Sequence, residues 1–401
     1  MPSPLTYLDT VDKHACCGCG ACISVCPVNC ISMKADAEGF LYPKIETDSC
    51  INCNTCRAVC PMPSAVSTSS QPQHIYACQL KASEERKRSS SGGIFYAIAK
   101  WIIQNSGIVY GAAFDNKLKL RHTTATTLEE LEALRGSKYI QSEISDVTFK
   151  EIKAHLQAQR WCYFVGTGCQ VAALKSFISK DKQHPYLITS DIICHGVPSQ
   201  WLFDTHIRHL EKQRGSKVTQ YQFRDNSQWG GAEIVDYENG ERSTLPSYSL
   251  SPYLYAFMNG FVSRESCYEC PFATQHRVSD ITLGDFWGGA KLFKTLDATT
   301  GISFCAVNTE QGANMWQNIV KDIDYVETDI LAAIPNNSNL VRPTPRPIIR
   351  DSIFETIRTK GYDYTAKTAF KPQNYMKLRI IYFFLRFSFI KRIKNLLQAA
   401  L

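Results

Sequence analysis

The sequence lacks three features that would each indicate a different class of protein. Its first residues, MPSPLTYLDT, have neither the charged start nor the apolar core of a signal peptide, so we expect a protein of the reducing cytoplasm. Its uninterrupted apolar stretches are much shorter than the roughly 20 residues that span a bilayer. The formal charge is +7, but no helix-turn-helix, zinc-finger or RNA-binding signature organises the basic residues. We therefore expect no membrane span and no nucleic-acid partner.

Cysteine, by contrast, is abundant and unevenly distributed. Ten of the 17 cysteines lie within the first 60 residues of this 401-residue chain. Disulfide frameworks belong to small secreted proteins, so this local enrichment predicts metal binding.

Two copies of one cysteine motif account for most of this enrichment. Each copy reads C-x2-C-x2-C-x3-C and is followed by proline, which is the spacing of bacterial two-cluster ferredoxins. Three closely spaced thiolates bind one 4Fe–4S cluster, and the fourth cysteine reaches the other cluster. We expect one cluster on Cys16, Cys19, Cys22 and Cys60, and a second on Cys26, Cys50, Cys53 and Cys56. A pair of zinc sites is the alternative, but zinc favours four ligands arranged in two pairs.

Composition divides the chain into four parts. We expect a ferredoxin domain at 1–65, a polar linker at 66–74, an oxidoreductase body at 75–345 and a basic, apolar tail at 346–401. In the ferredoxin domain, residues 36–50 predict a hairpin with Gly39 at its turn. Cys17 and Cys30 fall outside the ligand spacing, and we expect them to be small buried residues.

The body alternates strand-like and helix-like patterns, which predicts an α/β fold. The expected strands are 107–114, 161–166 and 186–194, and the expected helices are 93–103, 170–178 and 199–213. Residues 218–225 and 232–242 predict antiparallel strands, so we expect a mixed sheet. Cys78, Cys162 and Cys305 lie within apolar runs and are expected in the core.

The tail carries seven Lys or Arg and no acidic residue between Lys371 and Lys394. A basic, aromatic helix of this kind could lie on an anionic membrane surface or dock a partner. The alternative is a helix packed on the body, because its apolar residues cover nearly all faces. We expect a cytoplasmic protein and keep peripheral contact with the inner membrane surface open.

Four further cysteines are candidates for a third cluster. Cys169 and Cys194 end predicted strands, whereas Cys267 and Cys270 form a C-x-x-C pair. We expect each sulfur to project from a loop, where it can reach iron. Their spacing alone leaves a zinc site and plain core cysteines open.

Several motifs in order resemble the coenzyme F420 hydrogenase/dehydrogenase beta-subunit family. They are residues 88–103, 134–142, 166–176, 191–203 and 267–288, and the resemblance extends over about residues 10–345. That family includes beta subunits of deazaflavin-reducing hydrogenases and formate dehydrogenases, and 7-hydroxymethyl chlorophyll a reductase. The resemblance implies an FAD-containing α/β body with its own 4Fe–4S cluster, held by Cys169, Cys194, Cys267 and Cys270.

The resemblance also implies a set of flavin contacts. They are Arg88, Ser90, Ser91, Gly92, Gly93, Lys138, Tyr139 and Asp285. The glycines would allow close backbone approach, and Ser91 is expected to cap the following helix; a plain helix cap is the alternative reading of this segment. His195 is a candidate catalytic proton donor, although a surface or core histidine fits equally. The GTG turn at 166–168 lacks the third glycine of a Rossmann fingerprint, so we do not expect NAD there.

These expectations predict an FAD- and 4Fe–4S-dependent oxidoreductase. Hydride would pass between FAD and a small organic molecule, either deazaflavin-like or another reducible compound, and single electrons would pass through the clusters. The redox partner would be a ferredoxin or another enzyme subunit. A non-catalytic electron-transfer subunit is the main alternative, and a metal-scaffolded interaction protein is a third. Substrate identity and the direction of electron flow stay open.

Overall fold

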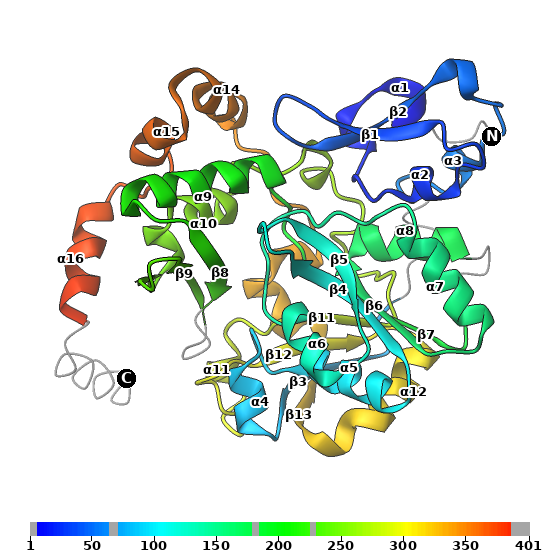
Figure 1. Ribbon diagram of the computed structural model, residues 1–401. Helices are drawn as coiled ribbons and strands as arrows, with labels where there is room; N and C mark the ends of the chain where they lie inside the picture. The colour runs from blue at the N-terminus through cyan, green and yellow to red at the C-terminus, as the bar shows by residue number, and fades with distance from the viewer. Residues whose placement is uncertain (1–5, 64–70, 179–183, 225–229, 386–401) are drawn as a thin grey trace.

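The computed structural model describes residues 6–63, 71–178, 184–224 and 230–385. Residues 66–70 of the expected linker and 386–401 of the expected tail lie outside them. Figure 1 shows a small N-terminal domain in blue seated on a larger α/β body. The α/β class, the mixed sheet and the N-terminal ferredoxin-like part are all confirmed.

The N-terminal domain is built around one hairpin and two short helices that follow the cysteine loops. Its elements are α1 (Tyr7–Thr10), α2 (Ala21–Val25), β1 (Ile31–Ala35), β2 (Leu41–Ile45) and α3 (Thr55–Ala58). Strands β1 and β2 are antiparallel, as expected, and Gly39 turns between them with φ +79°. A Cβ at Gly39 would lie 2.2 Å from Trp201 Cβ, so glycine also lets the body approach this turn closely.

The body is organised on an eight-stranded mixed sheet. Its strand order is β13-β3-β12-β11-β7-β6-β4-β5, with a parallel centre of β11, β7, β6 and β4 and antiparallel strands on both sides. The strands are β3 (His74–Leu80), β4 (Ile108–Phe114), β5 (Leu120–Ala125), β6 (Cys162–Thr167), β7 (Leu187–Ile192), β11 (Ile281–Asp285), β12 (Ser303–Val307) and β13 (Ile323–Thr328). Cys78, Cys162 and Cys305 are fully buried in it, as expected.

Helices cover both faces of this sheet because successive strand residues point to opposite sides. In β6, Tyr163 belongs to the core under α5, α6 and α12, whereas Phe164 belongs to the core under α7 and α8. These helices are α5 (Ile94–Gln104), α6 (Leu128–Leu134), α12 (Glu310–Ile319), α7 (Thr148–Gln157) and α8 (Gly168–Ile178). Helix α2 of the N-terminal domain packs on α7 and α8, so the cysteine loops face this layer.

A second, three-stranded sheet lies beside the first. The strands β8 (Val218–Arg224), β9 (Gly231–Tyr237) and β10 (Arg242–Leu245) are antiparallel, as expected. They do not join the main sheet, however, so the expectation that they make that sheet mixed was wrong. The antiparallel strands that make the main sheet mixed are β3, β5, β12 and β13. The sequence did not predict this pairing, because period-2 patterning identifies a strand but not its partner.

The second sheet shares its core with the N-terminal domain and with the start of the tail. Phe40 and Tyr42 of the hairpin pack in one apolar cluster with Phe354 and Tyr362. The helices of this region are α9 (Gln200–Arg214), α10 (Pro252–Met258), α14 (Arg350–Lys360) and α15 (Tyr362–Thr368). Residues 350–370 therefore pack as part of the body, although the sequence assigns them to the tail.

The remaining helices are short or peripheral. They are α4 (Ser83–Lys87), α11 (Gly289–Leu292), α13 (Ile330–Ala333) and α16 (Tyr375–Leu385). Helix α16 exposes Met376, Ile380 and Phe383. Within the described ranges, no helix is both long and apolar enough to cross a bilayer.

Candidate functional site

The two cysteine loops of the N-terminal domain have the same backbone shape. Gly18 and Gly20 have positive φ in the first loop, and Asn52 and Asn54 have positive φ at the matching positions of the second. Glycine and asparagine tolerate this left-handed conformation better than other residues. The repeated left-handed turns curl each C-x2-C-x2-C loop so that its cysteines can face a common centre.

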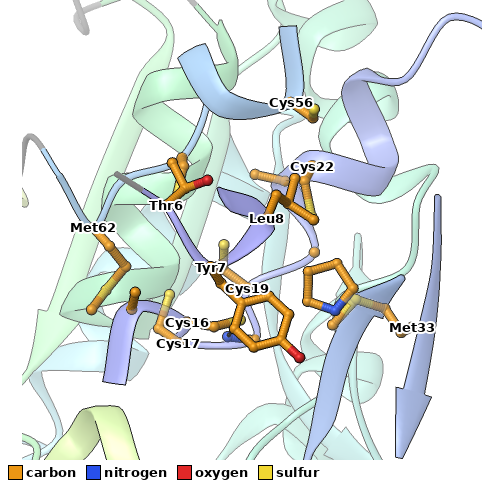
Figure 2. A pocket seen from close by; sticks show the side chains of 16 residues that line it. Thr6, Tyr7, Leu8, Cys16, Cys17, Cys19, Cys22, Met33, Cys56 and Met62 are labelled. Atoms are coloured by element: carbon orange, nitrogen blue, oxygen red, sulfur yellow. Dashed lines mark hydrogen bonds between the residues drawn. The ribbon is translucent and has the colours of Figure 1, made fainter. Parts of the chain in front are cut away.

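The first cysteine set comes together as the spacing predicts. Burial, and then the neighbouring thiols of Cys19, Cys16 and Cys60, raise the pKa of Cys22 well above its usual value. Figure 2 shows Cys16, Cys19 and Cys22 around a pocket of about 410 Å³ that Cys60 also lines. Burial also raises the pKa of Cys16 and Cys60, whereas a hydrogen bond with Cys17 lowers the pKa of Cys19. Three of the four thiols thus favour their protonated form, and iron binding would expel those protons.

The second set lies nearer the molecular surface. Burial raises the pKa of Cys56, and the thiol of Cys53 contributes to this rise, so these two sulfurs are close. Cys53 is exposed, and a hydrogen bond with Thr55 at 3.2 Å lowers its pKa. Cys26 Sγ lies 3.6 Å from the sulfur of Cys30, which is buried as expected but lies beside this expected ligand.

The third set surrounds a cavity in the body. Cys169, Cys194, Cys267 and Cys270 line about 740 Å³ of open space. Burial, followed by the thiols of the other three, raises the pKa of Cys267 well above its usual value. Over the residues that the structure describes, no group of three His, Cys, Asp or Glu side chains converges on a point where one metal ion could bind. The four cysteines line one open cavity instead.

The elements that carry the third set differ in one respect from the sequence-based expectation. Cys194 follows β7, and Cys267 ends a short 3₁₀ helix, Glu265–Cys267. Cys169, however, is the second residue of α8 and does not lie in a loop, because the helix begins directly after β6.

Arg277 links the C-x-x-C loop to the end of β7 through hydrogen bonds. Its guanidinium donates to the carbonyls of Phe272 and Thr274, each at 3.0 Å, and to the Asp191 carboxylate at 2.5 Å. Both charged side chains are almost fully buried, with 3% and 1% exposed. Arg277 could not be identified from the sequence, because a single arginine has no spacing signature.

Cys17 and Met62 line both the cavity at the first cysteine set and the cavity at the third set. Cys17 is buried, with 8% exposed, as expected for a small core residue. Its sulfur nevertheless interacts with Cys19 on one side and Cys169 on the other, and these thiols and burial raise its pKa well above the usual value. The first and third cysteine sets are therefore separated by little more than this side chain.

Three of the expected flavin contacts converge on Arg224, which no sequence motif marks. Arg224 donates to Tyr139 Oη at 2.8 Å, to the Ser90 carbonyl at 3.0 Å and to the Asp285 carboxylate at 2.5 Å. Its guanidinium also faces the ring of Trp287 at 5.5 Å. The ends of β8 and β11 thus meet the segment before α5 at this point.

The segment before α5 differs from the expectation. Gly93, with φ +91°, is the N-cap of α5, so the prediction that Ser91 caps this helix was wrong. Ser91 Oγ is buried and has no hydrogen-bond partner among the described residues. A Cβ at Gly92 would lie 2.3 Å from the Cys78 carbonyl, so this glycine allows close packing on β3.

The other three candidates lie in different surroundings. Arg88 is half exposed and pairs with Glu132 at 2.6 Å. Lys138 donates to the carbonyls of Ala133 and Arg135, and burial lowers its pKa to about 7. Burial also lowers the pKa of His195 to about 4, and its ring lies 4.4 Å from that of Phe257.

Comparison with known proteins identifies two regions. Residues 159–332 match the family model for the C terminus of the coenzyme F420 hydrogenase/dehydrogenase beta subunit, and residues 15–63 match the 4Fe-4S dicluster domain. No curated protein matches the chain. Among solved structures, a chain of the F420-reducing NiFe hydrogenase complex from Methanosarcina barkeri, determined as a xenon derivative, is similar. It shares 18% identity with a TM-score of 0.44, covering 75% of this chain and 92% of that one.

The first family model includes all four cysteines of the third set, and the second includes all eight cysteines of the ferredoxin motif. The chain therefore combines a 4Fe-4S dicluster domain with a following region that matches the C terminus of the coenzyme F420 hydrogenase/dehydrogenase beta subunit.

Proposed function

We propose that this protein is an FAD- and 4Fe–4S-dependent oxidoreductase that exchanges electrons between a small organic molecule and a protein partner. The observation that carries this proposal is the continuous arrangement of the three cysteine sets. The third set lies in the body, the first set adjoins it across Cys17, and the second set reaches the surface at Cys53. This order supports a path of three clusters from the body to an exposed end.

The donor set fits iron–sulfur clusters. Each set supplies four cysteines, and backbone amides donate to the ligand sulfurs at two places, Gly18 N to Cys16 Sγ at 3.4 Å and Gly196 N to Cys194 Sγ at 3.5 Å. Amide hydrogen bonds of this type stabilise cluster thiolates and tune reduction potentials. Four cysteines around one open cavity, with no site for a single metal ion among the described residues, support a polynuclear cluster over a single zinc ion.

Two features support a flavin near Arg224. The buried hydroxyl of Ser91 has no partner in the described part of the chain, and burial leaves Lys138 with a pKa of about 7, so both could bind a polar group. When bound, FAD would exchange two electrons with an organic molecule and release or accept them singly. Arg224, fixed by Asp285 and Tyr139, would orient the polar edge of the ring.

The chain's own residues would also control protons and water at this site. Neutral His195, packed on Phe257, could hold a proton on its ring close to the Cys194 position. We propose a deazaflavin-like or similar reducible molecule as substrate, and a ferredoxin or enzyme subunit as the partner at the Cys53 end. Contact of α16 with a membrane surface also belongs to this proposal, since its apolar side chains are exposed.

The test is iron and flavin analysis of anaerobically purified full-length protein. We expect about twelve irons and one FAD per chain. Cys267→Ala should lose about four irons, whereas the matched control Cys305→Ala, in the core of β12, should lose none. About eight irons without flavin in the unmodified protein would refute the proposal.

A non-catalytic electron-transfer subunit is the alternative, and the same cysteine path would serve it. Full iron content without flavin, together with stable co-purification with a partner enzyme, would favour this alternative.

A further inference from the structure

Arg264 is a fully buried arginine that reaches from the body into the first cysteine loop. Its side chain is 0% exposed. Nε donates to the Cys16 carbonyl at 2.7 Å, and Nη2 donates to Cys16 Sγ at 3.4 Å and to the Leu41 carbonyl at 2.9 Å. The guanidinium carbon lies 4.1 Å from the ring centre of Tyr42. A residue of the body therefore contacts a ligand of the ferredoxin domain directly.

Within the described ranges, no carboxylate pairs with Arg264. Arg277 and Arg350, also buried, form ion pairs with Asp191 and Glu38 respectively. Arg264 instead donates a hydrogen bond to the sulfur of Cys16. A buried cation without a counter-charge is costly, so thiolates are the groups available to balance it.

The two loops of the ferredoxin repeat differ at the position that Arg264 occupies. A Cβ on Gly18 would lie 2.6 Å from Gln141 Nε2 and 2.8 Å from Arg264 Nη1, so glycine makes room for both side chains. The matching residue of the second loop is Asn52, which is exposed. Only the first loop is thus built to receive an arginine from the body.

We propose that Arg264 is a positioning residue that raises the reduction potential of the cluster held by Cys16, Cys19, Cys22 and Cys60. Reduction adds one electron, and hence one negative charge, to that cluster. A fixed cation that donates a hydrogen bond to a ligand sulfur stabilises the more negative state, and it does so strongly where water is excluded. The inference rests on the assignment of Cys16 as a cluster ligand within the proposed function.

The test is a redox titration of the full-length, cluster-loaded protein, followed by electron paramagnetic resonance. In Arg264→Gln, the reduction equilibrium constant of one cluster should fall at least tenfold, a shift of about 59 mV to lower potential for one electron. Arg264→Lys keeps the charge but not the fork of donors, so it should shift that potential less. Loss of the same signal in Cys60→Ser would assign it to the first cluster.

The matched control is Arg350→Gln. Arg350 is buried at the same domain interface and binds Glu38 at 2.6 Å, but none of its hydrogen bonds to the described residues is to a cysteine. In this variant, the reduction equilibrium constant of the first cluster should stay within threefold of its value in the unmodified protein. Equal shifts in both variants, or no shift in Arg264→Gln with full iron, would overturn the proposal.

Iron content separates failure of this proposal from failure of the proposed function. Iron missing from the first set in unmodified protein would remove the cluster assignment itself. Iron missing only from both Arg264 variants would overturn the inference, because Arg264 would then be required for assembly and not for tuning.

Discussion

Replacing Arg277 by methionine should destabilise the protein and release the cluster of the third set. Methionine has a similar length, so the change removes the guanidinium with little loss of volume. Asp191 would keep its hydrogen bonds from Ser279 at 2.7 Å and Thr282 at 2.6 Å but lose its counter-charge. The carbonyls of Phe272 and Thr274 would lose their donor, which holds the C-x-x-C loop in place.

The expected magnitude follows from the burial of this ion pair. Removal of one partner of a buried pair typically costs about 3 to 5 kcal/mol, because the remaining charge is left uncompensated. Denaturant unfolding of the two proteins would measure this difference. Iron analysis should show about four irons fewer per chain, since Cys267 and Cys270 would no longer be held toward Cys194.

Arg242→Met is the matched control, because Arg242 forms an exposed ion pair with Asp236. Exposed pairs contribute about 1 kcal/mol or less, so this variant should keep its iron and nearly all its stability. The reasoning would be refuted if Arg277→Met retained full iron and lost less than about 1 kcal/mol. A double-mutant cycle with Asp191→Asn would isolate the energy of the pair itself.

Three further predictions concern groups outside the cysteine sets. Glu233→Ala should lower the free energy of unfolding in urea by about 3 to 5 kcal/mol, because buried His206, Tyr221 and Ser251 all bond that carboxylate; a loss below about 1 kcal/mol would count against this network. Burial lowers the pKa of His122 to about 4, so the unfolded state takes up its proton first and stability should fall by about 2 kcal/mol from pH 7 to pH 5. His122→Gln should reduce this acid sensitivity in the same unfolding assay, and an unchanged pH profile would contradict the assignment. Because burial lowers the pKa of Lys138 to about 7, FAD affinity measured by fluorescence titration should weaken as pH rises above 7. Lys138→Arg should remove this dependence, and a pH-independent affinity in the unmodified protein would disprove a contact between the Lys138 ammonium and FAD.

Local sequence signals were sufficient to predict the ferredoxin domain. Its ligand spacing spans few residues, so Cys16 to Cys26 and Cys50 to Cys60 could be assigned without tertiary information. The third set was harder, because Cys169 and Cys270 lie about 100 residues apart and only the family resemblance grouped them. The strands and helices of the body were also predictable from periodicity, whereas the separate sheet of β8 to β10 was not.

The arginines at the sites could not be predicted. Arg224, Arg264 and Arg277 lie on different segments, and each acquires its role from groups far away in sequence, such as Cys16 and Asp191. No short motif marks a side chain that acts through tertiary contacts. The prediction that Ser91 caps α5 was wrong for a different reason: Gly93, with its positive φ, is the N-cap.

The position of Arg350 has a consequence for how electrons would travel. This residue lies more than 300 positions after the ferredoxin hairpin, yet it donates to the Glu38 carboxylate there, while Ser199 Oγ donates to the Glu38 backbone carbonyl at 2.6 Å. Without such contacts, a ferredoxin domain could move relative to the body and carry electrons between the body and the partner. These contacts hold it in one place instead, so the hop from the body to the first cluster has one fixed length. The rate of internal electron transfer should then be independent of solvent viscosity, and only the encounter with the partner should depend on diffusion.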